Sequence, residues 1–337
     1  YDTYYLNTNA SVYKWDNTIS KWGYVSSAGE VVNSTTAFSL WFGTSGGTKY
    51  TDLPHLIELT GPLTTSTVAN ASSLNYHIGD AADFIGGISD GWNMIANPYP
   101  SGLDWSIVEA GFGSNISSFY YIYDAANDNY FSSNSGVIAP FQAFFVKLED
   151  NTANGSIVLD FDNSDRTITK TKFLKKEVPQ ISLIVKSGNS KFDLISIRFN
   201  ELATDEFDLK FDAYKLNSPD TKVPRFYSTI VKDKGSIKSC INTTPLPTDK
   251  SVIPIGFESS IGGSRTISLD SFYLDNPLDI WLLDNLTKSR TNLLESSYQF
   301  AHNPANEAGR FTLFLGPELS EDEIAISDDP LIYVKNE

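Results

Sequence analysis

Short segments with alternating apolar and polar residues recur along the chain, separated by turns rich in Asn, Asp, Ser, Thr and Gly. Such segments include 12–16, 121–124, 194–199 and 310–314. A period of two residues places neighbouring side chains on opposite faces of a strand, whereas a helix requires a period near 3.6. Stretches with the helical period are sparse. The pattern therefore predicts an all-β chain of short strands.

The first half of the chain contains an internal repeat, a hairpin followed by an alternating strand. In the first copy Trp15 precedes Trp22 by seven residues, and in the second copy Tyr123 precedes Tyr130 by the same spacing. Turn residues lie between the aromatic residues in both copies. The next matching segments are 38–42 with 141–146, and then 56–59 with 157–161. Three matches in the same order predict a duplication.

An opening strand precedes only the second copy. It lies in the segment 91–100, whereas the first copy begins close to the start of the chain, at Tyr13. Truncation of the chain would explain this difference. Alternatively, the gap leaves an open edge that a strand of another chain fills. Since the chain starts at Tyr1 without a signal-peptide pattern, we expect a processed or truncated chain.

A change in composition divides the chain into two domains. The segment 165–180 is rich in lysine and contains no glycine, and we interpret it as a linker. The prediction is two tandem β-sandwich domains of the jelly-roll kind. The predicted regions are an aromatic-rich sandwich with two repeats over 1–164, a linker over 165–180, a second sandwich over 181–317, and an acidic tail with a terminal strand over 318–337.

Composition and charge restrict the class of protein. Of the 337 residues, 41% are hydrophobic and 13% aromatic, which is enough to build packed cores. The net charge of −16 makes nucleic acid and anionic membrane surfaces poor partners. The sequence contains no run of about 18 apolar residues, so no membrane-spanning helix is predicted. A single cysteine, Cys240, permits no internal disulfide, and an extracellular protein of this size without disulfides is typical of bacteria.

One segment carries a family resemblance. Residues 91–100, followed by Leu103-Asp104-Trp105, resemble the GWN…NPYPS…DW stretch of large secreted Bacteroidota surface proteins. The similarity continues through 121–124 and 138–146, and the second domain resembles the module that usually follows. In such proteins this pair precedes a C-terminal sorting domain read by the type IX secretion system. In this sequence the sorting domain is absent, or only its first residues are present at 332–334, as expected after cleavage on export. The resemblance implies an extracellular or cell-surface location and brings no catalytic residues.

The residues of this segment are predicted to be structural. An Xaa-Pro pair forces extended or turn backbone, asparagine can bond local amides, and the two tryptophans would cover a sandwich core. The motif residues are Trp92, Asn93, Asn97, Pro98, Pro100 and Trp105.

Signs of catalysis are weak. Residues 43–47 match G-x-S-x-G, but no helical pattern follows, so a glycine-rich turn is expected. His55, His77 and His302 do not have the spacing of metal ligands, and with one cysteine a zinc site is not indicated. Carboxylates are plentiful without one pair that suggests a glycosidase. We therefore predict that the protein is not an enzyme.

Two kinds of binding site are considered. A calcium ion could use the oxygen-rich turn Asp124, Asn127, Asp128 and Asn129, although an Asx-rich hairpin turn explains these residues as well. Asp205, Asp208 and Asp212 form a weaker calcium candidate, for which charged positions on an exposed strand are the alternative. Sugar rings could stack on Trp15, Trp22, Trp41 and Tyr130, although alternation places half of each strand's aromatic residues in the core.

The leading hypothesis is a non-catalytic, extracellular cell-surface protein with a structural or adhesive role. It could assemble by strand exchange between copies. The alternative is a carbohydrate-binding module of an exported polysaccharide-degrading system.

Overall fold

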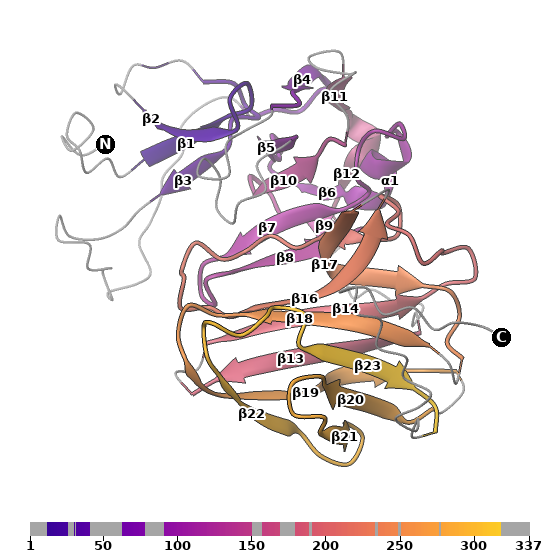
Figure 1. Ribbon diagram of the computed structural model, residues 1–337. Coiled ribbons are helices and arrows are strands. Elements are labelled where there is room, and N and C mark those ends of the chain that lie inside the picture. Colours follow the sequence, from indigo (N-terminus) through magenta and orange to yellow (C-terminus); the bar gives the residue numbers. More distant parts are fainter. Residues whose placement is uncertain are drawn as a thin grey trace. The chain divides into compact units, whose positions relative to one another are not determined.

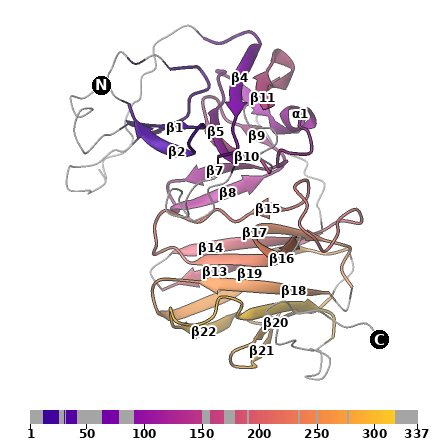
Figure 2. The same ribbon diagram turned by 45° about the horizontal axis from the view of Figure 1, so that its top comes forward.

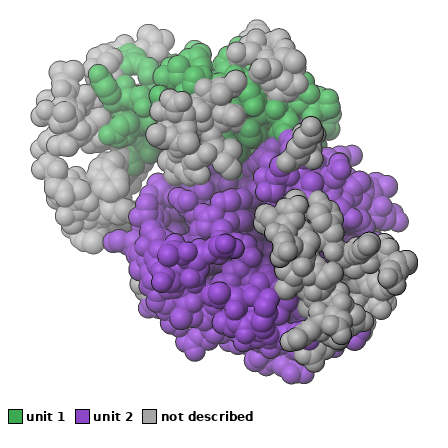
Figure 3. Space-filling model, in the orientation of Figure 1, with its two compact units in different colours: residues 1–122, 131–173 green, residues 123–130, 174–337 purple. Residues whose placement is uncertain are grey.

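The computed structural model forms two compact units (Figure 3). Unit 1 comprises residues 1–122 and 131–173, and unit 2 comprises 123–130 and 174–337. The residues described are 12–25, 30, 32–40, 63–77, 91–149, 157–168, 179–188, 191–232, 235–248, 251–275 and 278–317. Strands make up nearly all of their regular structure, so the predicted all-β class is confirmed. These residues contain no helix that is long and apolar enough to cross a membrane.

The units divide within the predicted linker, but its first residues are not a linker. Arg166 and Thr167 form strand β12 (Arg166–Thr167), which pairs with β6 (Gly102–Asp104) inside unit 1. The sequence also did not show that residues 123–130, the tip of a hairpin, belong to unit 2. The predicted tail 318–337 and the predicted strand 56–59 lie outside the described residues.

The first repeat forms a three-stranded antiparallel sheet in the order β2-β1-β3 (Figure 1). Its strands are β1 (Val12–Asp16), β2 (Lys21–Tyr24) and β3 (Phe38–Leu40). The second repeat forms a sheet in the order β5-β10-β7-β8. Its strands are β5 (Trp92–Ala96), β7 (Tyr120–Asp124), β8 (Asn129–Ser133) and β10 (Ala143–Lys147).

The rest of unit 1 covers one face of the second repeat. It consists of β4 (Val68–Leu74) paired with β11 (Ile157–Phe161), β6 between β12 and β9 (Val137–Ile138), the helix α1 (Trp105–Ala110) and the 3-10 turn η3 (Asn163–Asp165). Their apolar side chains share one core. Its buried members are Leu74, Ile95, Tyr99, Leu103, Trp105, Val108, Ile116, Tyr120, Ile138, Phe144, Val146, Leu148, Leu159 and Phe161.

Unit 2 is built on one continuous sheet around one core (Figures 1 and 2). The strand order is β21-β20-β23-β18-β16-β17-β14-β13-β19-β22, and β15 pairs with β17 off this path. The strands are β13 (Gln180–Ser187), β14 (Phe192–Phe199), β15 (Ala213–Tyr214), β16 (Arg225–Lys232), β17 (Gly235–Thr244), β18 (Val252–Glu258), β19 (Gly263–Tyr273), β20 (Ile280–Asp284), β21 (Arg290–Asn292), β22 (Tyr298–His302) and β23 (Phe311–Leu315).

The sequence of β14 shows why this sheet encloses a core. Buried and half-buried residues alternate strictly along the strand, and Ile195, Ile197 and Phe199 are the buried apolar set. The two terminal strands of the sheet, β21 and β22, are consecutive in the chain. Arg310, just before β23, donates from Nη1 to the carbonyl of Ala301 in β22 at 2.8 Å. The terminal strand β22 therefore lies close to β23, near the other end of the strand order, and the sheet curves around its apolar core.

A glycine in β18 makes room for a tyrosine in the neighbouring strand. Gly256 lies directly opposite Tyr227, and a Cβ atom at this glycine would lie 2.2 Å from Cε2 of the ring. Gly256→Ala should therefore lower the unfolding free energy by about 1–3 kcal/mol, because the ring must move within a packed structure. Urea unfolding measures the loss. Gly309→Ala, where nothing lies within 4 Å of the new Cβ, is the control, and an equal loss in both variants would contradict the explanation.

Candidate functional site

The two repeats have hairpin turns with the same local geometry. In the first turn Oδ1 of Asp16 accepts from the amide of Thr18 at 2.8 Å, and in the second Oδ1 of Asp124 accepts from the amide of Ala126 at 3.0 Å. Each turn ends in a residue with left-handed backbone, Ser20 at φ 49° and Asp128 at φ 52°. Few non-glycine residues adopt this conformation. Its recurrence at the same place supports the predicted duplication.

Aromatic contacts across the two hairpins also correspond. The rings of Trp15 and Trp22 lie 5.3 Å apart, and those of Tyr123 and Tyr130 lie 5.2 Å apart. Both repeats then add a third strand beside the first strand of the hairpin, β3 in one and β10 in the other.

The strand registers identify the equivalent residues. Tyr13 lies opposite Ser39, and its counterpart Tyr121 lies opposite Phe145. Phe38 therefore corresponds to Phe144, and Leu40 corresponds to Val146. The sequence matches 38–42 with 141–146 only as whole segments, and the strand pairing fixes the register between them. Alternating apolar residues allow several such matches, and only the pairing selects one.

Equivalent residues of the two repeats differ in exposure. Phe144 and Val146 are completely buried, whereas Phe38 is 37% exposed and Leu40 is 41% exposed. In the second repeat the ring of Trp105 packs on Phe144 with centroids 5.6 Å apart. Strand β5 pairs along the outer edge of β10, but among the described strands none pairs along the outer edge of β3. We call Phe38, Leu40 and this edge of β3 the open face, and it is the candidate functional site.

The outer edge of β5, in contrast, is covered by the first repeat. Asn17 donates from Nδ2 to the carbonyl of Met94 at 3.3 Å, and its Oδ1 accepts from the Met94 amide at 2.8 Å. Ser20 donates from Oγ to the carbonyl of Trp92 at 3.1 Å, and the amide of Ala96 donates to a backbone carbonyl of the first repeat at 2.9 Å. A turn of one repeat therefore occupies the strand edge of the next. The sequence predicts only a turn between Trp15 and Trp22 and gives no sign of this contact.

The motif asparagines hold backbone segments together inside unit 1. Asn93 accepts from the amide of Asn75 at 2.8 Å and donates to the carbonyls of Asn75 and Gly91 at 3.0 Å. Gly91 has φ 73°, and a Cβ there would lie 2.1 Å from the carbonyl oxygen of Leu148, so only glycine fits. Asn97 donates to the carbonyls of Ser101 and Ala139 at 2.9 Å. Both asparagine side chains are completely buried.

The other motif residues build the core. Trp92 and Trp105 are completely buried, and Nε1 of Trp105 donates to the carbonyl of Ser118 at 2.7 Å. Pro98 is buried and Pro100 is half-buried. Between these prolines, the hydroxyl of Tyr99 donates to the carbonyl of Phe161 at 3.0 Å. Every motif residue thus has a place in the structure of unit 1.

The four calcium candidates lie in one turn, where Asp124 and Asn127 bond to each other and the other two bond to residues outside the turn. Asp124 accepts from Nδ2 of Asn127 at 2.6 Å, a bond that lowers the pKa of its carboxyl. Asp128 accepts from Nζ of Lys191 at 2.6 Å, and Asn129 donates to Asp193 at 3.0 Å. Within the described residues, no three His, Cys, Asp or Glu side chains are placed to hold a metal ion. The bonds that Asp124 accepts from Ala126 and Asn127 are those of an Asx turn.

The second acidic cluster is not on an exposed strand, which corrects one alternative. Asp212 is 1% exposed and ends a turn, where it accepts from the amides of Asp208 and Thr243 at 2.7 Å. Asp208 instead accepts from the amide of Lys210 at 2.8 Å. Tertiary packing buries Asp212, and that burial raises the pKa of its carboxyl to about 7.

The raised pKa of Asp212 predicts a pH dependence. Because the folded state holds the proton more tightly than the unfolded state, this group contributes its full stability below pH 4. That contribution should be lost as the pH rises to about 7, at up to about 1.4 kcal/mol per pH unit. Asp212→Asn should flatten the pH dependence of the urea midpoint over this range. Asp270→Asn, at an exposed position, should not, and equal flattening in both variants would contradict the assignment.

The residues of the predicted sugar platform differ in exposure and belong to different units, Trp15 and Trp22 to unit 1 and Tyr130 to unit 2. Trp15 is 6% exposed and packs on Phe145 with ring centroids 5.0 Å apart, so burial removes its face from any ligand. Trp22 and Tyr130 are half-buried. Tyr24 is far more exposed than these three residues. Trp41 and the G-x-S-x-G segment 43–47 lie outside the described residues.

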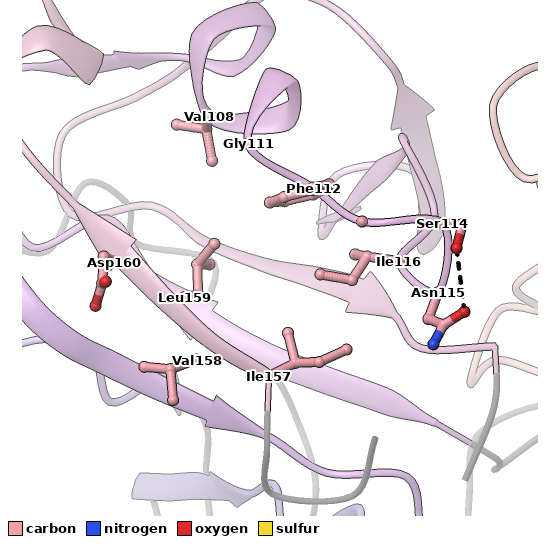
Figure 4. A pocket seen from close by; sticks show the side chains of 11 residues that line it. Val108, Gly111, Phe112, Ser114, Asn115, Ile116, Ile157, Val158, Leu159 and Asp160 are labelled. Atoms are coloured by element: carbon pink, nitrogen blue, oxygen red, sulfur yellow. Dashed lines mark hydrogen bonds between the residues drawn. The ribbon is translucent and has the colours of Figure 1, made fainter. Parts of the chain in front are cut away.

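A pocket of about 400 Å³ lies in unit 1 between β11 and the residues that follow α1 (Figure 4). Its lining is mainly apolar, with Val108, Phe112, Ile116, Ile157 and Leu159. The polar lining residues are Ser114, Asn115 and Asp160. Asp160 is the one titratable lining residue, whereas acid–base catalysis by paired carboxylates requires two.

Comparison with curated proteins and with solved structures finds no significant match. A family model does match, over residues 112–315. The matched region contains the β7–β8 hairpin and most of unit 2, and it exceeds half of the chain. The chain therefore belongs to the family described as Domain of unknown function (DUF8693).

Proposed function

We propose that the protein is a non-catalytic structural or adhesive protein of the bacterial cell surface, which assembles by accepting a strand at the open face. The observation that carries this proposal is the exposure of Phe38 and Leu40, whose counterparts in the second repeat are completely buried. An apolar strand edge exposed in this way serves as a template for pairing with another chain.

Two other properties support this role. The net charge of −16 keeps a protein soluble while it presents a small apolar surface. The motif residues Asn93, Asn97 and Trp105 fix the backbone of the second repeat through buried hydrogen bonds. The resemblance to exported Bacteroidota proteins supports the surface location.

Self-association tests the proposal. Light scattering coupled to size exclusion, with negative-stain microscopy, should show oligomers whose mass increases with the concentration of the full chain. Phe38→Asp should reduce association at least tenfold, because it places a charge in the open face. Phe131→Asp replaces a side chain that is 55% exposed on β8 and serves as the matched control. A chain that stays monomeric at millimolar concentration would contradict assembly.

The surface location has its own test. Antibodies against the chain should label intact cells of the producing bacterium, and protease added to those cells should remove the label. Label that appears only after the cells are lysed would contradict the location.

A further inference from the structure

We infer that the partner recognised by the open face is a segment like residues 91–108 of this chain, supplied by a second polypeptide. We call such a segment a GWN-type segment: an extended strand, a proline-containing turn, and a helical turn that begins with tryptophan. This inference deepens the proposed function and rests on it. It names the chemistry of the partner, which self-association alone would not reveal.

The second repeat shows how such a segment would fit. Strand β5 pairs antiparallel with β10, and Ile95 lies opposite Phe144 while Asn93 lies opposite Val146. Ile95, like Phe144, is completely buried and belongs to the core of unit 1. Because Phe38 corresponds to Phe144, a strand in the same register places its isoleucine beside Phe38. The backbone of β3 supplies the hydrogen bonds, and Phe38 and Leu40 select the register.

The second half of the segment covers the face beside the strand. In the second repeat Leu103, Trp105 and Val108 pack in the same core as Phe144 and Val146. No described element covers Phe38 and Leu40 to that extent, since both remain more than one-third exposed. A strand alone would therefore form hydrogen bonds with the edge of β3 and leave the side chains of Phe38 and Leu40 partly exposed. The whole segment, including the tryptophan, is needed to bury the open face.

Charge also favours this partner. Residues 91–108 contain a single charged side chain, Asp104, in a chain whose net charge is −16. An acidic partner would be repelled, whereas a nearly neutral segment approaches without a large electrostatic cost. Lys14, which lies opposite Phe38 on β1, is already paired with Glu30 and adds no unpaired charge to the open face.

The test uses a synthetic peptide of residues 90–108 with a fluorescent label. Added to the full chain, it should bind with saturation in fluorescence anisotropy, and hydrogen exchange should show protection of the β3 amides. Phe38→Asp in the chain, or Ile95→Asp in the peptide, should weaken binding at least tenfold. Phe131→Asp should leave binding unchanged, and melting by circular dichroism confirms that each variant is folded.

Three results would overturn the inference. They are no binding at high micromolar peptide, binding that Phe38→Asp does not change, and protection of β10 instead of β3, which would mean that the peptide replaces β5 in its own repeat. The proposed function fails separately. A chain that binds the peptide but stays monomeric retains the inference and loses self-assembly. A chain that forms oligomers but does not bind the peptide would retain self-assembly and overturn the inference about the partner.

Discussion

Replacement of Asp193 by alanine should lower the unfolding free energy by about 3–5 kcal/mol. Asp193 is 1% exposed, and its carboxylate accepts from Nζ of Lys215 at 2.5 Å, from Asn129 at 3.0 Å and from the amide of Phe226 at 2.7 Å. Removal of the carboxylate leaves the ammonium of Lys215, which is 4% exposed, buried without its counter-ion. The loss comes mainly from that uncompensated charge.

Urea unfolding of the full chain measures the loss, and hydrogen exchange assigns the transition to unit 2. Asp270→Ala is the control, because Asp270 is exposed on β19, and its effect should stay within about 0.5 kcal/mol. Addition of Lys215→Met to Asp193→Ala should restore part of the stability, since both charges are then absent. If the double variant is as unstable as the sum of the two single variants, the buried charge is not the cause.

The sequence predicted the elements of this protein better than their pairing. Alternation within a few residues identified β1 and β14, and in β14 burial on one face of the strand produces that local pattern. The parallel pairing of β14 with β17 leaves no such signal, since the two strands are far apart in the chain. Strand order in a large sheet depends on these distant contacts.

The candidate site was predicted only in outline. The repeat comparison indicated an incomplete first copy, but it matched 38–42 with 141–146 only as whole segments and did not pair individual residues. Strand pairing was needed to show that Phe38 occupies a position that is buried in the other repeat. The exposure of a side chain depends on which other segments pack against its side of the strand. The local pattern of apolar and polar residues does not contain that information. For the same reason Asp212, expected on an exposed strand, is buried beneath a turn.

The second large effect is expected at Arg310, where alanine should also lower the unfolding free energy by about 3–5 kcal/mol at pH 7. The guanidinium donates from Nε and Nη2 to the two oxygens of Asp284 at 2.9 and 2.6 Å and lies over the rings of Phe300 and Phe311. Asp284 is completely buried, so the variant leaves a carboxylate without its cation.

The pH dependence of the Arg310→Ala loss separates charge from packing. Burial alone would raise the pKa of Asp284, but the bonds from Arg310, from the Tyr298 hydroxyl and from the Leu286 amide together outweigh it, so the folded pKa lies below the ordinary value. The pair therefore contributes stability above the unfolded pKa near 4, which is lost as the pH falls through the folded pKa. The loss in urea unfolding should shrink toward acid pH. Arg225→Ala, which removes a surface partner of Glu258, should cost at most about 1 kcal/mol. A loss at Arg310 that does not change with pH would assign it to packing on Phe300 and Phe311.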